Sequence, residues 1–408
     1  MKNLAAQLAR RKQENLYRTR QVIDSPQGVE VTIAGRRFLS FCSNDYLGLA
    51  NHPEVVAAFR KGLDEYGAGS GAAHLVTGHS RAHHELEEEL ADFVQRPRAL
   101  LFSCGYMANL GVIMALTGRA DRIFEDRLNH ASLLDGARLG AARLVRYAHA
   151  DTGLLEQAMA SAPPGEYLVA TDGVFSMDGD CAPLPELATL ADRHAAWLMV
   201  DDAHGLGVLG PGGRGSVAAA GLGLSGVPVL MGTLGKAFGT FGAFVAGSHD
   251  LIETLIQAAR TYVYTTAPPP AVASATCAAL QRVKQDTWRR EHLQDLVGRF
   301  RRGAEQLGLE LCASTTPIQP VIVGEPGMAV RLSDALRAQG ILITAIRPPT
   351  VPEGTARLRI TFSAAHTGAQ IDRLLDALEK IFATEAGENR KTIARKDVEP
   401  PGINIQEL

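Results

Sequence analysis

The stretch that decides the fold is residues 229–243, Val229-Leu-Met-Gly-Thr-Leu-Gly-Lys-Ala-Phe-Gly-Thr-Phe-Gly-Ala243. One lysine, Lys236, lies here among apolar residues and glycines, with no carboxylate in the segment. About 35 residues upstream, an apolar run ends in acidic residues, Trp197-Leu-Met-Val-Asp-Asp-Ala-His204. This combination predicts an amine and a carboxylate, Lys236 and Asp201, that work together beyond the ends of two strands.

A pyridoxal phosphate (PLP) enzyme needs such a pair. Its lysine amine forms a Schiff base with the aldehyde of the cofactor. Its carboxylate keeps the pyridine nitrogen protonated, so that the ring can accept electrons. Either residue alone would be unremarkable in a protein of this size, but their spacing favours PLP as the cofactor.

The bulk properties exclude several classes of function. The chain has 408 residues, which predicts a large domain and a smaller one. Its net charge of −3 gives no electrostatic reason to expect nucleic acid or a membrane as partner. No apolar leader or membrane-length apolar run is present, so we expect a cytoplasmic enzyme. The cysteines are dispersed, without the spacing of a zinc site or disulfide framework: Cys42, Cys104, Cys181, Cys277 and Cys312.

Helical and strand-like segments alternate from about residue 50 to 260, which predicts an α/β domain with a mostly parallel sheet. In such sheets, ligands bind beyond the carboxyl ends of the strands. Polar residues follow four of the expected strands, and we expect the cofactor among them: Ser103, Asp172, Asp201 and Thr233.

The rest of the chain divides around Pro268-Pro-Pro270, a predicted turn into a small C-terminal α+β domain. We expect a polar helix to about residue 20, a hairpin around Ala34-Gly35, and one long helix from about 271 to 307. The predicted units are an N-terminal helix and hairpin, the PLP-binding domain, the small domain and a charged tail, at residues 1–42, 43–270, 271–384 and 385–408.

Three motifs suggest other ligands, and each fails in detail. Gly205-Leu-Gly-Val-Leu-Gly210 has the glycine spacing of a dinucleotide site, which would make the chain a nicotinamide-dependent oxidoreductase. Pro211 would break the required helix, and no ribose-binding acid follows before Asp250. Gly235-Lys236 lacks the other P-loop residues, and residues 172–180 lack the spacing of a calcium loop.

Histidines cluster near the start of a predicted helix. His79, His83 and His84 stand beside Glu85 and could suggest a metal centre. The sequence Glu85-Leu-Glu-Glu-Glu89 is typical of a solvated amphipathic helix, so we expect no metal.

Other residues could serve the cofactor. Ser103-Cys-Gly-Tyr-Met-Ala-Asn109 combines a strand end, a glycine turn and a helix start, which suit a phosphate. His130 could lie over the pyridine ring, and Ser176 could donate its hydroxyl near the ring oxygen.

Together these segments identify a family. The chain resembles the α-oxoamine synthases of the fold-type I PLP enzymes, most closely their biotin-synthesis branch, over roughly residues 1–382. The resemblance is carried by Ser43-Asn-Asp-Tyr-Leu-Gly-Leu49, Gly69-Ser-Gly71, Asn129-His-Ala-Ser132, Gly173-Val-Phe-Ser-Met-Asp-Gly-Asp180, Val200-Asp-Asp-Ala-His-Gly205, Gly232-Thr-Leu-Gly-Lys-Ala-Phe-Gly239, Thr344-Ala-Ile-Arg-Pro-Pro-Thr-Val-Pro352 and Gly354-Thr-Ala-Arg-Leu-Arg359. His74 also favours this branch, since glycine-using relatives tend to carry arginine there.

The resemblance implies the aspartate-aminotransferase-like fold and a role for each matching residue. Lys236 would carry the cofactor and act as the base, and Asp201 would pair with the pyridine nitrogen. His204 and Ser176 would contact the ring hydroxyl, and His130 would stack on the ring. The phosphate end would be served by Gly105, Tyr106 and Thr233.

The resemblance also implies the substrates. L-Alanine would condense with a pimeloyl thioester, carried by acyl carrier protein or coenzyme A, with loss of carbon dioxide. Arg347 would hold the alanine carboxylate, and Arg18 and Thr350 would contact substrate. The site would lie at a homodimer interface, with Thr265 or Thr266 reaching the neighbouring phosphate. Another family member, such as a glycine C-acetyltransferase, is the nearest alternative.

Overall fold

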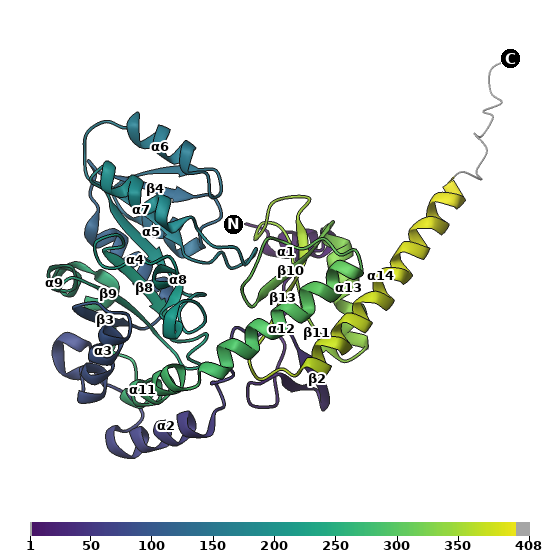
Figure 1. Cartoon of the computed structure of the whole chain (residues 1–408), viewed down its shortest axis with the longest axis horizontal. Helices are drawn as coiled ribbons and strands as arrows, with labels where there is room; N and C mark the ends of the chain where they lie inside the picture. Colours follow the sequence, from purple (N-terminus) through teal and green to yellow (C-terminus); the bar gives the residue numbers. More distant parts are fainter. Residues whose placement is uncertain (1, 397–408) are drawn as a thin grey trace.

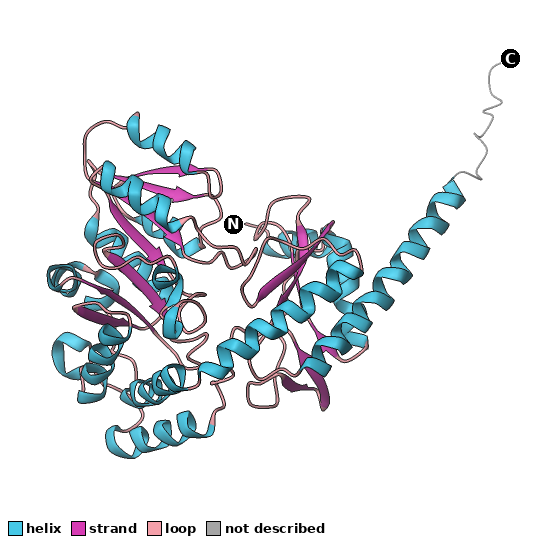
Figure 2. Cartoon of the chain, viewed as in Figure 1, coloured by secondary structure: helices cyan, strands magenta, loops and turns pink. Residues whose placement is uncertain are grey.

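The computed structural model describes residues 2–396, which form a large domain and a small domain (Figure 1). The large domain is built on a seven-stranded sheet in the order β3-β9-β8-β7-β6-β4-β5. Its strands are drawn in magenta, with helices in cyan around them, on the left of Figure 2. Only β9 runs antiparallel to its neighbours, so the predicted mostly parallel sheet is confirmed. The strands are β3 (Arg98–Phe102), β4 (Arg122–Asp126), β5 (Arg143–Tyr147), β6 (Tyr167–Asp172), β7 (Trp197–Asp201), β8 (Val229–Thr233) and β9 (Ala243–Gly247).

Helices cover both faces of this sheet, because successive strand residues are apolar in both directions. In β6, Leu168 and Ala170 pack into the layer of α4, α5 and α9, whereas Val169 packs on the opposite face. The large-domain helices are α2 (Pro53–Tyr66), η1 (His74–Gly78), α3 (Arg81–Phe93), α4 (Gly105–Leu116), α5 (Ala131–Leu139), α6 (Thr152–Ala160), α7 (Leu184–Arg193), η2 (Pro211–Gly213), α8 (Gly215–Ala219), α9 (His249–Ala258), α10 (Arg260–Val263) and α11 (Pro270–Gln285).

The small domain contains two three-stranded sheets. Strand β13 (Ala356–Thr361) lies between β10 (Ile318–Gly324) and β12 (Thr344–Ile346), antiparallel to both. The second sheet joins both ends of the chain, because β2 pairs with β1 and, in parallel, with β11. These elements are β1 (Glu30–Ile33), β2 (Arg36–Ser40) and β11 (Ile341–Leu342), with helices α12 (Thr287–Gln306), α13 (Pro326–Ala338) and α14 (Gly368–Lys396).

The predicted hairpin is confirmed, since Ala34 and Gly35 both adopt positive φ, at 49° and 73°, as a tight two-residue turn requires. Two helix predictions need correction. The N-terminal helix α1 (Leu4–Gln13) is shorter than expected and has no buried residue to extend it. The expected helix over 271–307 is two helices, because Asp286 adopts a non-helical ψ of 63° and turns its carboxylate to Arg289.

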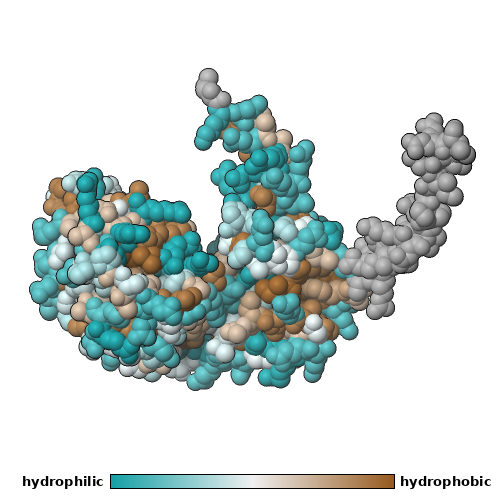
Figure 3. Space-filling model, turned by 90° about the horizontal axis from the view of Figure 1, so that it is seen from above, coloured by the Kyte–Doolittle hydropathy of each residue, from teal (hydrophilic) through white to brown (hydrophobic). Residues whose placement is uncertain are grey.

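The ends of the structure stand apart from its body. Figure 3 shows α1 rising away from the small domain and an apolar patch on the large domain beside the notch between the two. Helix α14 continues past Glu385 to Lys396, into the segment expected to be a tail, whose last residues, 397–408, lie outside the described structure. Within residues 2–396, no helix joins the length and the apolarity needed for a bilayer crossing.

Candidate active site

The polar residues expected around the cofactor meet at the carboxyl edge of the large sheet. Asp172, Asp201 and Thr233 are the last residues of β6, β7 and β8. Asp172 pairs directly with Asp201, so the two carboxylates are neighbours. Ser103 follows β3 at the same edge, because Phe102 and Thr233 both pair with Ala243 of the intervening strand β9.

Lys236 lies in the loop between β8 and β9. The loop turns sharply, with Gly239 at a φ of 68° and so close to another chain segment that a Cβ there would come 2.3 Å from the Ala50 nitrogen. This packing aims the lysine inward, and its Nζ lies 2.7 Å from Nε2 of His204. Burial lowers the pKa of Lys236 to about 8, against the opposing charge of Asp201. A useful fraction of the amine is therefore neutral near pH 7.

A chain of hydrogen bonds runs from Lys236 to the small domain. His204 Nδ1 lies 2.6 Å from the Tyr46 hydroxyl, which lies 3.2 Å from Oδ1 of Asn44. Both terminal nitrogens of Arg359, on β13, donate to the same Asn44 oxygen at 3.3 Å. Burial, with Lys236 adding nearby positive charge, lowers the pKa of His204 well below its usual value, so this histidine is neutral. With His204 neutral, each group of this chain can donate a hydrogen bond to the next group in the direction of Asn44.

Sequence reasoning gave no role to Asn44, Tyr46 or Arg359. All three lie in segments that carry the family resemblance, Ser43–Leu49 and Gly354–Arg359. The sequence held one signal, which is that arginine alternates with apolar residues in the segment that forms β13. In the structure, Arg359 of this segment is only 7% exposed. A buried arginine needs partners, and this one has them across the domain boundary.

Asp201 is held in place by two donors. Asn109 Nδ2 lies 2.6 Å from its Oδ2, and the backbone nitrogen of Ala203 lies 3.0 Å from its Oδ1. Its neighbour Asp172 accepts the backbone N–H of His130 at 2.6 Å. Burial, together with the charge of Asp201, raises the pKa of Asp172 well above its usual value. The site therefore orients Asp201 as the carboxylate available to a ligand.

His130 caps helix α5 and is oriented by its own turn. Its Nδ1 lies 2.7 Å from the Ser132 hydroxyl, and its ring is exposed above the strand ends. The loop before it is braced by His149, whose two nitrogens lie 3.0 Å from Asp126 Oδ1 and 2.8 Å from Asp180 Oδ2. This ion-pair bridge fixes the approach to His130.

We expect the His149 bridge to make stability depend on pH. Burial opposes the charge on His149, but hydrogen bonds to Asp126 and Asp180 outweigh it and raise its pKa from 6.5 to about 10. Since the folded pKa is the higher one, this stabilisation is complete below about pH 6.5 and is lost as pH rises through about 10. Thermal unfolding of His149→Gln should show a melting temperature below that of the wild type at pH 6, and the difference should shrink toward pH 10. A difference that grows with pH would contradict the bridge.

The remaining candidates suit a phosphate group. Gly105 and Tyr106 begin helix α4, and the residue before them, Cys104, makes no side-chain cap. The first N–H groups of the helix are thus left without a side-chain acceptor, as an anion site requires. Thr233 lies at the level of this helix start, whereas the Tyr106 hydroxyl donates to Asp135. Ser176 lies nearer the small domain, and its carbonyl accepts Arg359 Nε at 2.6 Å.

These features fit PLP. The oriented carboxylate of Asp201 suits the pyridine nitrogen, the partly neutral Lys236 suits the aldehyde, and the uncapped start of α4 suits the phosphate. His130 and His204 come from separate loops at the same edge of the sheet. The members of the predicted cofactor set therefore lie around one edge of the large domain, with Ser176 on the side where Arg359 approaches from the small domain.

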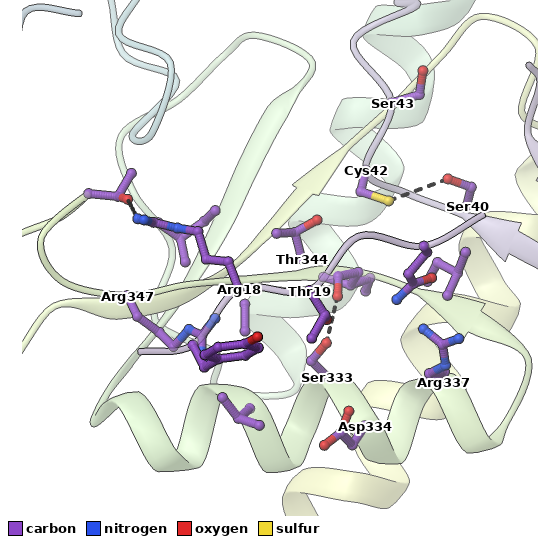
Figure 4. A pocket seen from close by; sticks show the side chains of 18 of the residues that line it. Arg18, Thr19, Ser40, Cys42, Ser43, Ser333, Asp334, Arg337, Thr344 and Arg347 are labelled. Carbon is purple, nitrogen blue, oxygen red and sulfur yellow. Dashed lines mark hydrogen bonds between the residues drawn. The ribbon is translucent and has the colours of Figure 1, made fainter. Parts of the chain in front are cut away.

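The expected substrate residues lie elsewhere, in a cavity of about 610 Å³ between the N-terminal segment and the small domain (Figure 4). Arg18, Arg347 and Thr350 line it, and Arg18 Nη2 donates to the Thr350 hydroxyl at 3.2 Å. Arg347 donates to the backbone oxygen of Asn15. The structure does not bring Arg347 to Lys236. The arginine whose charge acts on Lys236 is Arg359, which reaches inward from β13.

The glycine motif near residue 205 has a structural explanation. Its first glycine packs against the buried Asp202, since a Cβ on Gly205 would lie 2.0 Å from the Asp202 carboxylate. Only the three-residue turn η2 and the five-residue helix α8 follow, so the motif does not open the long helix of a dinucleotide site. Burial raises the pKa of Asp202 to about 7, and its Oδ2 accepts the Ser216 N–H at 2.7 Å.

Comparisons with known proteins agree with this site. Residues 36–378 match the family model described as aminotransferase class I and II. A protein of Nitrosococcus oceani named 8-amino-7-oxononanoate synthase is 66% identical over 92% of this chain and 100% of the relative. One of the same name from Thioalkalivibrio sulfidiphilus is 62% identical over 93% of this chain and 97% of the relative.

Solved structures extend the likeness to the fold. A serine palmitoyltransferase of S. paucimobilis, with bound PLP, superposes with a TM-score of 0.88 at 31% identity over 92% of this chain and 96% of its own. An 8-amino-7-oxononanoate synthase from Francisella tularensis gives 0.75 at 33% identity over 86% and 99%. With its sheet, its lysine and its aspartate in place, the chain belongs to the class I and II aminotransferase family and, within it, to the 8-amino-7-oxononanoate synthases.

Proposed function

We propose that this protein condenses L-alanine with a pimeloyl thioester to give 8-amino-7-oxononanoate, carbon dioxide and the free carrier, a step of biotin synthesis. The observation that carries the proposal is Lys236, half-buried beside His204 and Asp201 in a chain that belongs to this family. The cofactor is pyridoxal phosphate, in keeping with the aminotransferase fold. When bound, it supplies an aldehyde for amines and a ring that accepts the electrons of a carbanion.

The chain's own residues handle the protons. Lys236 Nζ takes the α-proton of alanine, as a general base whose pKa of about 8 is close to working pH. His204 Nε2 holds that amine at 2.7 Å and directs it. Asp201 keeps a proton on the ring nitrogen, and the Asn109 amide keeps Asp201 oriented for this.

We assign the alanine carboxylate to Arg359, which replaces our expectation for Arg347. Arg359 acts electrostatically on both Lys236 and His204, whereas Arg347 lies beside Arg18 in the cavity. Both terminal nitrogens of Arg359 donate to the single amide oxygen of Asn44. A carboxylate offers two oxygens and could accept from the same guanidinium with better geometry. Alanine held there would present its α-hydrogen toward Lys236.

The cavity suits the acyl substrate. Arg18 and Arg347 lie together on one side of it and Arg337 on another, with apolar side chains such as Ile346 in its lining (Figure 4). A pimeloyl chain matches this lining, because it carries a negatively charged carboxylate at the end of five apolar methylenes. The lining reaches Ser43, the neighbour of Asn44, so the cavity and the Lys236 site meet at this segment.

Substitutions of Arg359 and Arg347 should affect the KM values of different substrates. Lysine cannot reproduce the two parallel hydrogen bonds of a guanidinium, so Arg359→Lys should raise the KM for alanine by about tenfold or more. Arg347→Lys should instead raise the KM for the pimeloyl thioester and leave that for alanine within about twofold. Steady-state kinetics with each substrate varied in turn would check both, and the reverse pattern would restore Arg347 as the alanine residue.

A substrate matrix tests the function itself. Turnover should be highest with alanine and a pimeloyl thioester, and lower when glycine or an acetyl thioester is substituted. A preference for glycine with acetyl thioester would favour the glycine C-acetyltransferase alternative. Running the matrix with acyl carrier protein and with coenzyme A would identify the carrier.

We further propose that the chain works as a homodimer, with Thr265 or Thr266 contributing to the neighbouring site. Thr266 and Tyr264 are exposed in the segment before α11, where a second copy could cover them. Light scattering of the purified protein would measure the mass, and a monomer at working concentration would contradict the proposal.

A further inference from the structure

Four histidines and a glutamate form a cluster outside the site described above. His74 opens η1, His79 follows it, and His83, His84 and Glu87 lie on the first turns of α3. Neighbouring imidazole rings lie 5.1–5.8 Å apart, and His74 also stacks on Tyr262 at 5.1 Å. No step of the proposed reaction uses them.

The two inner histidines are buried, and His83 is fully hydrogen-bonded, whereas Nε2 of His74 has no hydrogen-bond partner among the described residues. His83 accepts from Ser80 at Nδ1, 3.1 Å away, and Nε2 lies 2.7 Å from the Pro268 carbonyl. Both of its nitrogens therefore have partners. His74 Nδ1 lies 3.0 Å from His79 Nδ1, and the tautomer in which His79 Nδ1–H donates to His74 leaves a lone pair on Nε2 of His79. That nitrogen lies on the side of Glu87.

The outer members supply three ligand atoms. His79, His84 and Glu87 each offer one, and all three lie within 4.8 Å of one another. His84 and Glu87 are three residues apart, which puts them on one face of α3. Ligands of a tetrahedral zinc ion lie about 2.0–2.2 Å from the metal, hence roughly 3.4 Å apart. A modest rotation of the half-exposed His84 would close the site to that size.

Glu87 is the unusual member, because its side chain is only 13% exposed. Its Oε1 accepts the Leu101 N–H at 2.9 Å, which anchors the carboxylate, and Oε2 lies 4.0 Å from Nε2 of His79. Burial raises the pKa of Glu87 to about 7, although the Leu101 N–H and Arg98 oppose the shift. Anchored in this way, the carboxylate keeps its second oxygen on the side of His79.

We propose that His79, His84 and Glu87 bind one zinc ion, with water as a fourth ligand and His74 orienting His79. Two imidazoles and a carboxylate are a ligand set that zinc accepts, whereas magnesium and calcium prefer oxygen alone. The sequence expectation of no metal treated residues 85–89 as a solvated helix face. The structure instead buries Glu87 of this run and turns it toward the histidines. The ion would join the end of η1 to the start of α3, and so tie down the segment that contacts Pro268.

Zinc titration of the holoenzyme tests this site. With a chromophoric chelator as competitor, the wild type should take up one zinc ion per chain in excess of any bound by His84→Ala. Removing a ligand should weaken the affinity by more than about tenfold. His84→Ala is safe for folding, because this side chain is half exposed and, among the described residues, its contacts are an ion pair with Glu88 at 3.4 Å and the edge of the His79 ring. Glu87→Gln keeps an oxygen for the Leu101 N–H and should lose zinc to a similar extent.

Matched controls are His249→Ala and Glu85→Gln, an exposed histidine and an exposed acid outside the triad. Both should bind zinc as the wild type does, and any zinc held by the cofactor should be equal in all five proteins. Zinc should also raise the melting temperature of the wild type and the controls, but not that of His84→Ala. Absence of saturable binding by the wild type, or unchanged affinity in His84→Ala, would overturn the proposal. Because binding is measured without turnover, the result does not depend on the proposed reaction.

Discussion

Replacing Lys236 with alanine is expected to lower turnover by at least about 10³-fold. The variant loses the amine that carries the cofactor and also the base that removes the α-proton, and a general base alone contributes about 10²–10⁴-fold. The fold should persist, because the neighbouring loop is held by backbone hydrogen bonds and by the contact of Gly239 with Ala50. Turnover assays and the absorbance of the protein-bound cofactor are the measurements.

The spectrum separates a chemical from a structural effect. Lys236→Ala should still retain PLP weakly, through the start of α4 and Asp201, but without the absorbance of a lysine-bound Schiff base. Lys61→Ala is the matched control, an exposed lysine on α2 that should leave both readouts unchanged. Near-normal turnover with an intact lysine-bound spectrum would mean that another lysine carries the cofactor.

Replacing Asp201 with asparagine should lower kcat by on the order of 10²-fold or more, the range seen when a preorganised electrostatic partner is lost. An amide cannot hold a proton on the ring nitrogen as a carboxylate does. The backbone should change little, because asparagine can still accept the N–H of Ala203, which now lies 3.0 Å from Asp201 Oδ1. Single-turnover measurements would place the loss on the chemical step.

Asp202→Asn is the instructive comparison, since this neighbouring carboxylate faces glycines and Ser216 instead of the site. It should alter stability more than the chemical step. If Asp201→Asn instead loses stability while its folded fraction keeps full activity, Asp201 is a structural residue and the ring nitrogen has another partner.

Local patterns were enough to predict one half of the site. Asp172, Asp201 and Thr233 each end an apolar strand, and parallel strands bring their carboxyl ends to one edge whatever the details of packing. Lys236 follows in the loop after the last of these strands. The sheet direction and these residues could therefore be predicted from periodicity and spacing alone.

The other half depends on how the small domain docks. Arg347 and Arg359 are twelve positions apart and equally plausible in sequence, yet only Arg359 lies on the strand that faces Asn44. The family resemblance assigned the alanine carboxylate to Arg347, but the direction of a side chain across a domain boundary is a tertiary property. The break at Asp286 was hidden for a similar reason, because no glycine or proline marks it.

Glu87 shows the same limit in a shorter segment. Composition alone made residues 85–89 a solvated face, but the N–H of Leu101 draws one of these acids under the surface. Burial of a single side chain by a neighbouring strand leaves no trace in the local pattern.

The parallel pairing of β2 with β11 has a consequence for synthesis. A ribosome releases the amino end first, so the β1–β2 hairpin emerges long before the strand that completes its sheet. Until then, β2 presents an unpaired edge, and the apolar side chains Val31, Ile33 and Phe38 lack the cover of Leu342. The large domain can assemble meanwhile, because its strands are contiguous in the chain. A nascent chain that is halted before Ile341 would thus have a folded large domain and a β1–β2 hairpin whose apolar side chains are still exposed. This is the form of the chain most in need of a chaperone.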